Sequence, residues 1–130
     1  MRQPDFSVDG WSLEDGEDYH RRAPATFPIP DLAVRQILQP GDFAKLIFRI
    51  AVDSAEEPEA FERMWVIVRE RTPGGYLGML DNEPSAIQQN KEFWEGSELP
   101  FEPRHIIAVQ QANAESRRLA SRPAPIPWAR

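Results

Sequence analysis

The chain has 130 residues, which is enough for one domain and too few for two cores of ordinary size. It contains no cysteine, so a disulfide framework, a thiolate metal site and a cysteine nucleophile are all excluded. Its formal net charge of −6 repels nucleic-acid phosphates, which makes nucleic acid a poor candidate ligand. No apolar run resembles a signal peptide or a membrane span, so we expect a cytoplasmic domain that binds neither nucleic acid nor a membrane.

Charge and proline are unevenly distributed along the chain. Five arginines and a single glutamate lie in residues 103–130, so this part is positive while the rest carries the negative charge. The 13 prolines gather mainly near the two ends. We therefore expect an N-terminal arm over residues 1–30, a sheet core over 41–110, and a C-terminal helix with a proline-rich tail over 112–130.

A capped helix is predicted near the N-terminus. Ser12 and Asp15 are residues of the kind that accept the first backbone N–H groups of a helix. The charges that follow are acidic first and basic later, ending at Arg22, and this order suits the helix dipole. We expect one short helix here.

An extended arm and a second short helix are predicted next. Prolines alternate with apolar residues over 23–30, which favours an extended chain lying along the core through Phe27 and Ile29. Asp31 then precedes apolar residues at helical spacing, and the Pro-Gly pair at 40–41 ends the pattern. This turn or two should direct its apolar side inward.

Strand patterns fill the middle of the chain and predict a sheet of about five members. Apolar and polar residues alternate over the segments 43–52, 61–70, 76–80, 96–101 and 105–110. The Thr-Pro-Gly-Gly sequence at 72–75 supplies the tight turn of a hairpin, and helix formers over 112–121 predict the C-terminal helix. The expected fold class is α+β: a small, strongly bent antiparallel sheet with flanking short helices.

Glu62 and Asp81 are the strongest candidates for a polar site. In a hairpin, position 62 is expected near position 80, so the two carboxylates would lie close together. Adjacent carboxylates can differ in pKa and serve acid–base catalysis, with His105 as a third member. The alternative is structural, because a carboxylate beside Arg63 commonly forms a cross-strand pair and a histidine at a strand start commonly binds a local backbone group.

Metal and cofactor motifs are missing from the sequence. His20 and His105 are far apart and have none of the spacings of a metal site. The chain has no phosphate-binding glycine loop and no Gly-x-Ser-x-Gly elbow. We therefore predict no metal and no cofactor, and favour a non-enzymatic protein over an enzyme.

The four tryptophans offer either binding surface or anchors. Trp11, Trp94 and Trp128 lie in the predicted arm, loop and tail, where a ring can contact a partner or hold its own segment against the core. Trp65 lies on the face of its strand opposite the apolar one. Either a second layer, such as the arm, covers that face, or it is an exposed patch for binding.

Four stretches between residues 41 and 110 carry a family resemblance. They are Gly41-Asp42-Phe43-Ala44-Lys45-Leu46-Ile47-Phe48, Glu62-Arg63-Met64-Trp65-Val66, Gly78-Met79-Leu80-Asp81-Asn82-Glu83-Pro84, and Phe101 with His105-Ile106. Together they resemble an uncharacterised bacterial family, the domain of unknown function 2314. Residues 97–99 depart from the family's Asp-x-Val pattern, and the loop after the first strand is longer.

The resemblance implies a small, strongly bent sheet, with an SH3-like barrel as one option, and no established activity. The family's recurrent residues correspond to Lys45, Glu62, Trp65, Asn82 and Pro84. With Asp81 and His105, these are the positions expected to bind a ligand if a site exists. They are equally open to a structural interpretation.

Three functions stay open. The leading one is a non-enzymatic protein-binding module, whose acidic charge favours a basic protein partner. The second is a small-molecule binder or hydrolase-like enzyme that uses Glu62, Asp81 and His105. The third is a structural homodimer in which the tail and Trp128 clasp a second copy.

Overall fold

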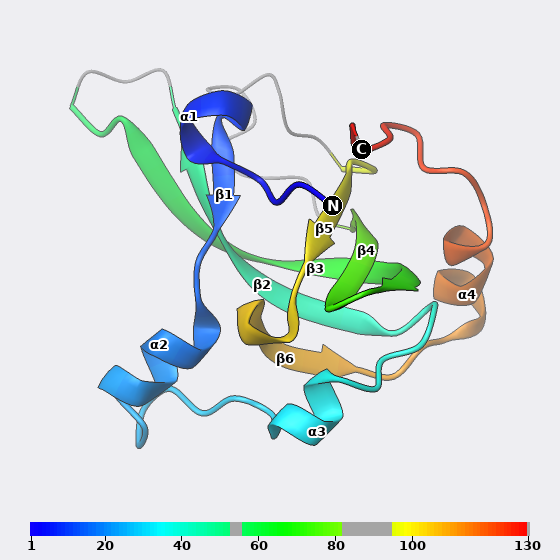
Figure 1. Cartoon of the computed structure of the whole chain (residues 1–130), viewed down its shortest axis with the longest axis horizontal. Helices are drawn as coiled ribbons and strands as arrows, with labels where there is room; N and C mark the ends of the chain where they lie inside the picture. The colour runs from blue at the N-terminus through cyan, green and yellow to red at the C-terminus, as the bar shows by residue number, and fades with distance from the viewer. Residues whose placement is uncertain (53–55, 82–94, 130) are drawn as a thin grey trace.

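The computed structural model describes residues 1–52, 56–81 and 95–129. These residues form one sheet of six strands, whose pairs are all antiparallel, and the sheet curls around a hydrophobic core (Figure 1). Four short α-helices and a 3-10 turn surround the sheet. The expected α+β class, with a bent antiparallel sheet and a C-terminal helix, is confirmed.

The elements follow one another along the chain with short connections. Their bounds are α1 Phe6–Asp9, β1 Trp11–Leu13, α2 Gly16–Arg22, α3 Leu32–Arg35, β2 Phe43–Ala51, β3 Glu59–Thr72, β4 Gly75–Leu80, β5 Glu98–Phe101, the 3-10 turn η2 Pro103–His105, β6 Ile106–Gln110 and α4 Ala114–Ala120. The β3–β4 hairpin turns at Pro73 and Gly74, where Gly74 has a positive φ of 81°, as the Thr-Pro-Gly-Gly sequence predicts.

β2 is the central strand of the sheet. One of its edges pairs with β3 along the whole strand, and the sheet continues from β3 through β4 to β5. Its other edge is shared, because β6 pairs with residues 43–46 and β1 pairs with residues 48–50. β1 and β6 therefore lie end to end along β2, although they come from opposite parts of the chain.

The alternation along β2 and β3 divides the sheet into two faces. The inner face carries the even-numbered residues of β2, among them Leu46 and Phe48, which are completely buried. Burying a side chain of this size contributes about 1.5–3 kcal/mol. On the outer face, α4 packs against Ile67 and Met79 through Ala120. The predicted two-sided pattern of these strands is confirmed.

The helix predicted from Ser12 and Asp15 is α2, and only Asp15 of these two residues caps it. Ser12 lies in β1, and Asp15 caps α2 by accepting a hydrogen bond from the Asp18 N–H (3.1 Å). Gly16 starts the helix where it packs closely on β6, since a Cβ at this position would lie 2.7 Å from Ile107 Cγ2. The predicted helix exists, but the strand before it was not foreseen because three residues are too few to show a period of two.

The arm after α2 lies against the outer face of the sheet. Phe27 packs on the Tyr19 ring at 5.3 Å between centroids, and the Arg63 guanidinium lies 5.1 Å from the centre of the Phe27 ring. His20 Nδ1 and the Phe27 carbonyl are 2.8 Å apart, which holds the arm to α2. Phe27 thus contacts α2 and the outer face of the sheet, whereas we predicted an arm that lies along the core through Phe27 and Ile29.

The helix after the arm does not turn its apolar side inward, which corrects the sequence prediction. Leu32 and Val34 of α3 are 47% and 39% exposed; in the chain that follows the helix, Ile37 is 62% exposed and Leu38 is buried. Arg35 is buried in their place. Helical spacing gathers these residues on a face but does not determine which way that face points.

Arg35 is buried because three separate segments supply it with hydrogen-bond acceptors. Its Nε donates to the Pro30 carbonyl (2.8 Å), and its Nη1 donates to the Pro103 carbonyl (2.9 Å) and to the Glu17 carboxylate (2.7 Å). The Tyr76 hydroxyl donates to the Arg35 carbonyl at 2.7 Å. Arg35 therefore joins the arm, α2, η2 and the sheet.

The two ends of the chain are held together by Trp128. Its ring meets Trp11 edge-on with centroids 5.8 Å apart, and its indole N–H donates to the Arg2 carbonyl (3.2 Å). Its backbone N–H donates to the Glu98 carboxylate (3.0 Å), which also pairs with Arg69. Trp11 and Trp128 thus act as anchors within their own chain, whereas Trp94 lies outside the described residues.

Gly78→Ala is expected to destabilise the protein by about 1–3 kcal/mol through overpacking. A Cβ at Gly78 would lie 2.5 Å from Val66 Cγ1 and 2.9 Å from both the Ile67 carbonyl oxygen and Phe101 Cε1. Urea titration gives the free energy of unfolding. Gly74→Asn is the control, because nothing lies within 4 Å of that position and asparagine tolerates positive φ. Equal stability of Gly78→Ala and the original protein would contradict this close packing.

Candidate functional site

Three of the predicted site residues gather on the outer face. Lys45 of β2 stands opposite Trp65 of β3, and Asp81, directly after β4, donates its backbone N–H to the Trp65 carbonyl (3.0 Å). The Lys45 ammonium is 5.5 Å from the centre of the Trp65 ring, and Phe43 meets that ring edge-on at 6.4 Å. Trp65 therefore has neighbours on both β2 and β4.

Asp81 is the member of this group with a perturbed acidity. Burial raises the pKa of its carboxyl, and the negative charge of Glu95 raises that pKa further. Both effects disfavour the charged carboxylate. A raised pKa alone does not make a site, because buried structural carboxyls show the same shift.

Glu62 does not join this group, which corrects the expected pairing of Glu62 with Asp81. The hairpin turns at Pro73 and Gly74, so Trp65 stands beside Asp81 and Glu62 lies three positions further along β3. Glu62 is also paired with Phe48, on the inner face of the sheet, whereas Asp81 follows the parity of the outer face. The two side chains therefore point to opposite faces.

His105 lies apart from both Asp81 and Glu62, because it is buried in η2, the turn before β6. Its Nδ1 accepts a hydrogen bond from the Glu102 N–H (2.9 Å), so the neutral ring carries its hydrogen on Nε2. Burial lowers the pKa of His105 to about 4, the positive charge of Arg104 lowers it too, and Asp15 acts in the opposite direction. At neutral pH this histidine is uncharged and its Nδ1 is bonded to the backbone.

Asn82 and Pro84 lie outside the described residues. Among the residues that are described, no three histidine, aspartate or glutamate side chains are grouped as a metal site would need. In the same residues, no helix has the length and apolar character needed to cross a bilayer.

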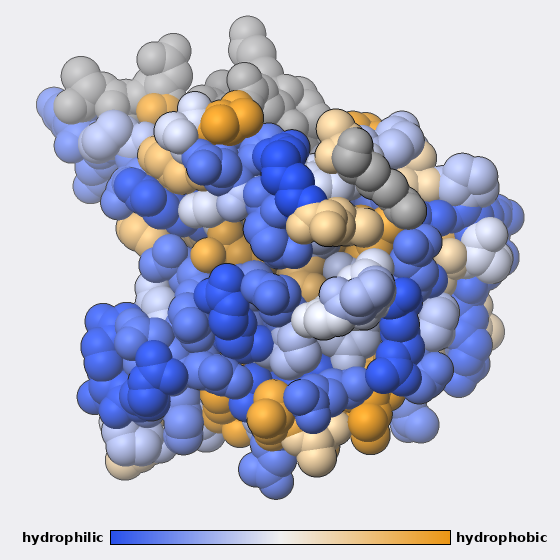
Figure 2. All heavy atoms as spheres, viewed as in Figure 1, coloured by the Kyte–Doolittle hydropathy of each residue, from blue (hydrophilic) through white to orange (hydrophobic). Residues whose placement is uncertain are grey.

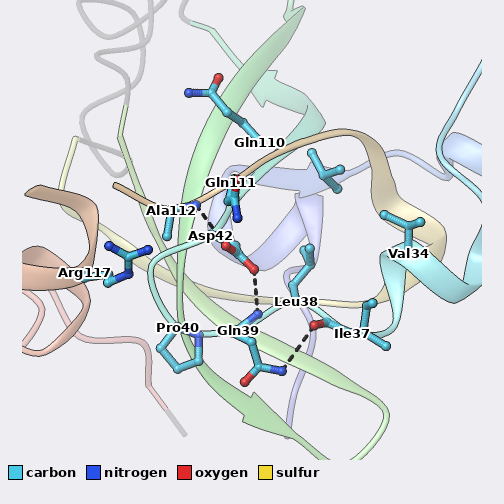
Figure 3. A pocket seen from close by; sticks show the side chains of 11 residues that line it. Val34, Ile37, Leu38, Gln39, Pro40, Asp42, Gln110, Gln111, Ala112 and Arg117 are labelled. Carbon is cyan, nitrogen blue, oxygen red and sulfur yellow. Dashed lines mark hydrogen bonds between the residues drawn. The ribbon is translucent and has the colours of Figure 1, made fainter. Parts of the chain in front are cut away.

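A groove of about 540 Å³ lies where β6 meets the connection from α3 to β2 (Figure 3). One wall is made by Val34, Ile37 and Pro40, and the buried Leu38 lies between this wall and the sheet. The opposite wall is the end of β6 and the chain that follows it, residues 109–112. We name this feature the β6 groove.

Apolar side chains are exposed along the first wall of the β6 groove. Val34 and Ile37 are both exposed, and both line the groove. Figure 2 shows hydrophobic residues at the lower edge of the molecule, over α3. Large exposed aliphatic residues that line a concave surface are typical of a binding site.

The edge of β6 that does not pair with β2 is open at the end of the strand, where residues 109–111 also line the β6 groove. In an edge strand, alternate residues direct their N–H and C=O groups away from the sheet. α2 packs on β6 at Ile107. Beyond it, within the described part of the chain, no backbone hydrogen bond other than those to β2 engages residues 108–111. The last part of β6 is therefore open to another strand.

Asp42 fixes the distance between the two walls. Its carboxylate accepts hydrogen bonds from the Gln39 N–H (2.9 Å) on one side and from the Ala112 N–H (3.0 Å) on the other (Figure 3). Hydrogen bonds from backbone N–H groups to a carboxylate are charge-assisted and stronger than neutral ones. The β6 groove is thus held open in a defined shape.

Arg117 of α4 lines the end of the β6 groove away from Val34 and Ile37 (Figure 3). It is exposed, and no hydrogen bond or ion pair joins its guanidinium to the residues that the structure describes. Its neighbour Arg118 differs in this respect, since it pairs with Glu115.

Comparison with models of protein families, with curated proteins and with solved structures finds no match to this chain. These comparisons therefore assign no function to the chain. What the β6 groove does is therefore inferred from its own chemistry, and the resemblance to the domain of unknown function 2314 stays a prediction.

The β6 groove was missed by sequence reasoning. Val34 and Ile37 have the spacing of core residues, so their exposure could not be foreseen. The positive charge of residues 103–130 was visible in the sequence and does point to α4. It could have directed attention to Arg117, but not to the groove beside it, because the groove depends on which strand lies at the edge of the sheet.

Proposed function

We propose that the protein is a binding module that holds an extended segment of a protein partner in the β6 groove. The observation that carries the proposal is the unpaired edge of β6 beside an exposed apolar wall. A segment that adds to this edge as a strand would gain backbone hydrogen bonds from β6, and its alternate side chains would contact the apolar wall.

The apolar wall can supply a useful part of the binding free energy. Burying apolar surface yields about 25 cal/mol per Å², so covering two exposed aliphatic side chains is worth a few kcal/mol at most. A micromolar Kd corresponds to about −8 kcal/mol. Apolar contacts and strand pairing together fit an affinity in this range, which is typical of modules that bind short segments.

The polar groups of the β6 groove favour binding over catalysis. Its ionisable lining residues are Asp42 and Arg117. Both oxygens of Asp42 accept backbone hydrogen bonds, so this carboxylate has a structural task and is not placed as a general base. Among the described residues that line the groove there is no histidine and no second carboxylate with which Asp42 could share a proton.

The two alternative functions have less support. A small-molecule binder or hydrolase-like enzyme that uses Glu62, Asp81 and His105 would need these groups on one surface, and they lie on opposite faces and in a buried turn. A homodimer clasped by the tail would need Trp128 to leave the contacts it makes with Trp11 and Arg2.

The proposal keeps three expectations from the sequence. The net charge of −6 would steer a partner of basic overall charge toward the protein. The cytoplasm would be the place of the encounter. The sheet would belong to the SH3-like barrels, a finer assignment that fits the proposal because such domains take up extended segments.

Ile37→Glu is expected to weaken the binding of extended peptides at least tenfold. The experiment selects a displayed library of random twelve-residue peptides on the immobilised full chain and measures the Kd of synthetic versions by fluorescence anisotropy. Ile37 is 62% exposed, so a charge there should leave the fold intact while it interrupts the apolar wall. The cost is the burial of an unpaired carboxylate against apolar peptide side chains.

Val8→Glu is the matched control, because Val8 is also an exposed aliphatic residue and lies outside the β6 groove. It should change the Kd by less than twofold. If no peptide is enriched, or if both variants bind the selected peptides as tightly as the original protein, the proposed function is wrong.

A further inference from the structure

We infer that the segment bound in the β6 groove carries an acidic side chain that pairs with Arg117. This inference rests on the proposed function and specifies the chemistry of the partner. It follows from the position of Arg117, from its lack of an ionic partner, and from the charge around it.

The position of Arg117 is set by close packing on the loop before β2. A Cβ at Gly41 would lie 2.8 Å from Arg117 Cγ and 3.2 Å from Arg117 Cα, so the stem of the arginine runs directly over this glycine. Gly41 has a φ of 99°, which also favours glycine there. The guanidinium is thereby presented at the end of the groove away from Val34 and Ile37.

Arg117 has the chemistry to recognise a carboxylate, and no residue in the described part of the chain pairs with its guanidinium. A guanidinium presents a planar set of donors that matches both oxygens of a carboxylate. Other arginines of the protein use this capacity internally, as Arg118 does with Glu115 and Arg35 with Glu17. Asp42, the carboxylate in the groove, is bonded to backbone N–H groups instead.

The surrounding charge favours an acidic group at this end. Residues 103–130 hold five arginines and one glutamate, and α4 belongs to this positive part of the chain. A partner can be basic overall and still place one acidic residue here, because steering depends on net charge whereas an ion pair is a contact. Salt screens long-range steering over about 8–10 Å, and it screens an ion pair in contact much less.

An acidic residue inside the segment is favoured over a terminal carboxylate. Arg117 is exposed, so the groove opens to solvent beside it and a bound segment can continue past it. The bound motif then combines apolar residues, which contact Val34 and Ile37, with an aspartate or glutamate several positions away along the extended chain.

The test uses the selected peptides with two matched variants of the full chain. Arg117→Gln should weaken the Kd about threefold to fivefold, since an ion pair at an exposed position is worth about 1 kcal/mol or less. Arg118→Gln removes the same charge from the same helix outside the groove and should weaken the Kd less than twofold. Changing the peptide's acidic residue to its amide should weaken the Kd for the original protein by the same factor. The same change in the peptide should leave the Kd for Arg117→Gln unchanged.

The outcomes separate this inference from the proposed function. Loss of binding in Ile37→Glu with no effect of Arg117→Gln leaves the proposed function standing and overturns the acidic pairing. Equal losses in Arg117→Gln and Arg118→Gln mean a general charge effect and also overturn it. If the binding of a peptide depends on its free C-terminal carboxyl and not on an internal acidic residue, the acidic pairing is likewise overturned. If no peptide binds, both are wrong.

Discussion

Arg35→Ala should lower the free energy of unfolding by roughly 3–5 kcal/mol, because leaving a buried polar group without its hydrogen-bond partner costs about 1–3 kcal/mol each. The substitution would leave the Pro30 and Pro103 carbonyls without their donor, and the Glu17 carboxylate, which is about one-third exposed, without its ionic partner. Urea or thermal unfolding at pH 7 measures the loss.

Two further variants separate the contributions of Arg35. Arg35→Met keeps much of the side-chain volume but none of the donors, so it should lie close to Arg35→Ala. Glu17→Ala removes the ionic partner alone, and since Glu17 is about one-third exposed the cost should be near 1 kcal/mol or less. An Arg35→Met protein as stable as the original would contradict the view that hydrogen bonds, rather than packing, make Arg35 important.

His105 should make the protein lose roughly 3 kcal/mol of stability between pH 7 and pH 4. Its pKa is about 4 in the folded protein and 6.5 in the unfolded chain, so below pH 6.5 the unfolded chain binds a proton that the folded protein does not. The stabilisation is present above pH 6.5 and is lost as the pH falls. Roughly 2 kcal/mol of it should be gone by pH 5.

His105→Asn is the variant that isolates this effect. An asparagine oxygen can accept the Glu102 N–H in place of Nδ1, but it does not titrate. Chemical unfolding at a series of pH values should therefore show a steep loss of stability in the original protein and a flatter curve in the variant. Parallel curves for the two proteins would mean that other groups, such as the carboxyls, cause the loss.

The sheet was predictable from the sequence because β2 and β3 are long enough to show their period. β2 has nine residues and β3 has fourteen, and over such lengths the alternation identifies both the strand and its buried face. β1 has only three residues, and its pairing with β2 depends on a chain segment far away in sequence. The C-terminal helix was also predictable, since its strong helix formers begin at a capping residue, Asn113.

The sites were less predictable because each depends on a relation between distant segments. The predicted approach of Glu62 to Asp81 was wrong because the β3–β4 hairpin turns at Pro73 and Gly74. The centre of this turn decides which residue of β3 faces which residue of β4. The burial of Arg35 depends on carbonyls of Pro30 and Pro103, which no local pattern reveals. The β6 groove depends on which strand lies at an edge.

The shared edge of β2 has a consequence for how the chain folds during synthesis. β1 leaves the ribosome early and can cover only residues 48–50 of β2, while residues 43–46 wait for β6. Until residue 110 has emerged, half of the central strand keeps an open edge to which another nascent chain could bind. The sheet is therefore completed only after the residues of β6 have left the ribosome, although most of its other strands are made well before them.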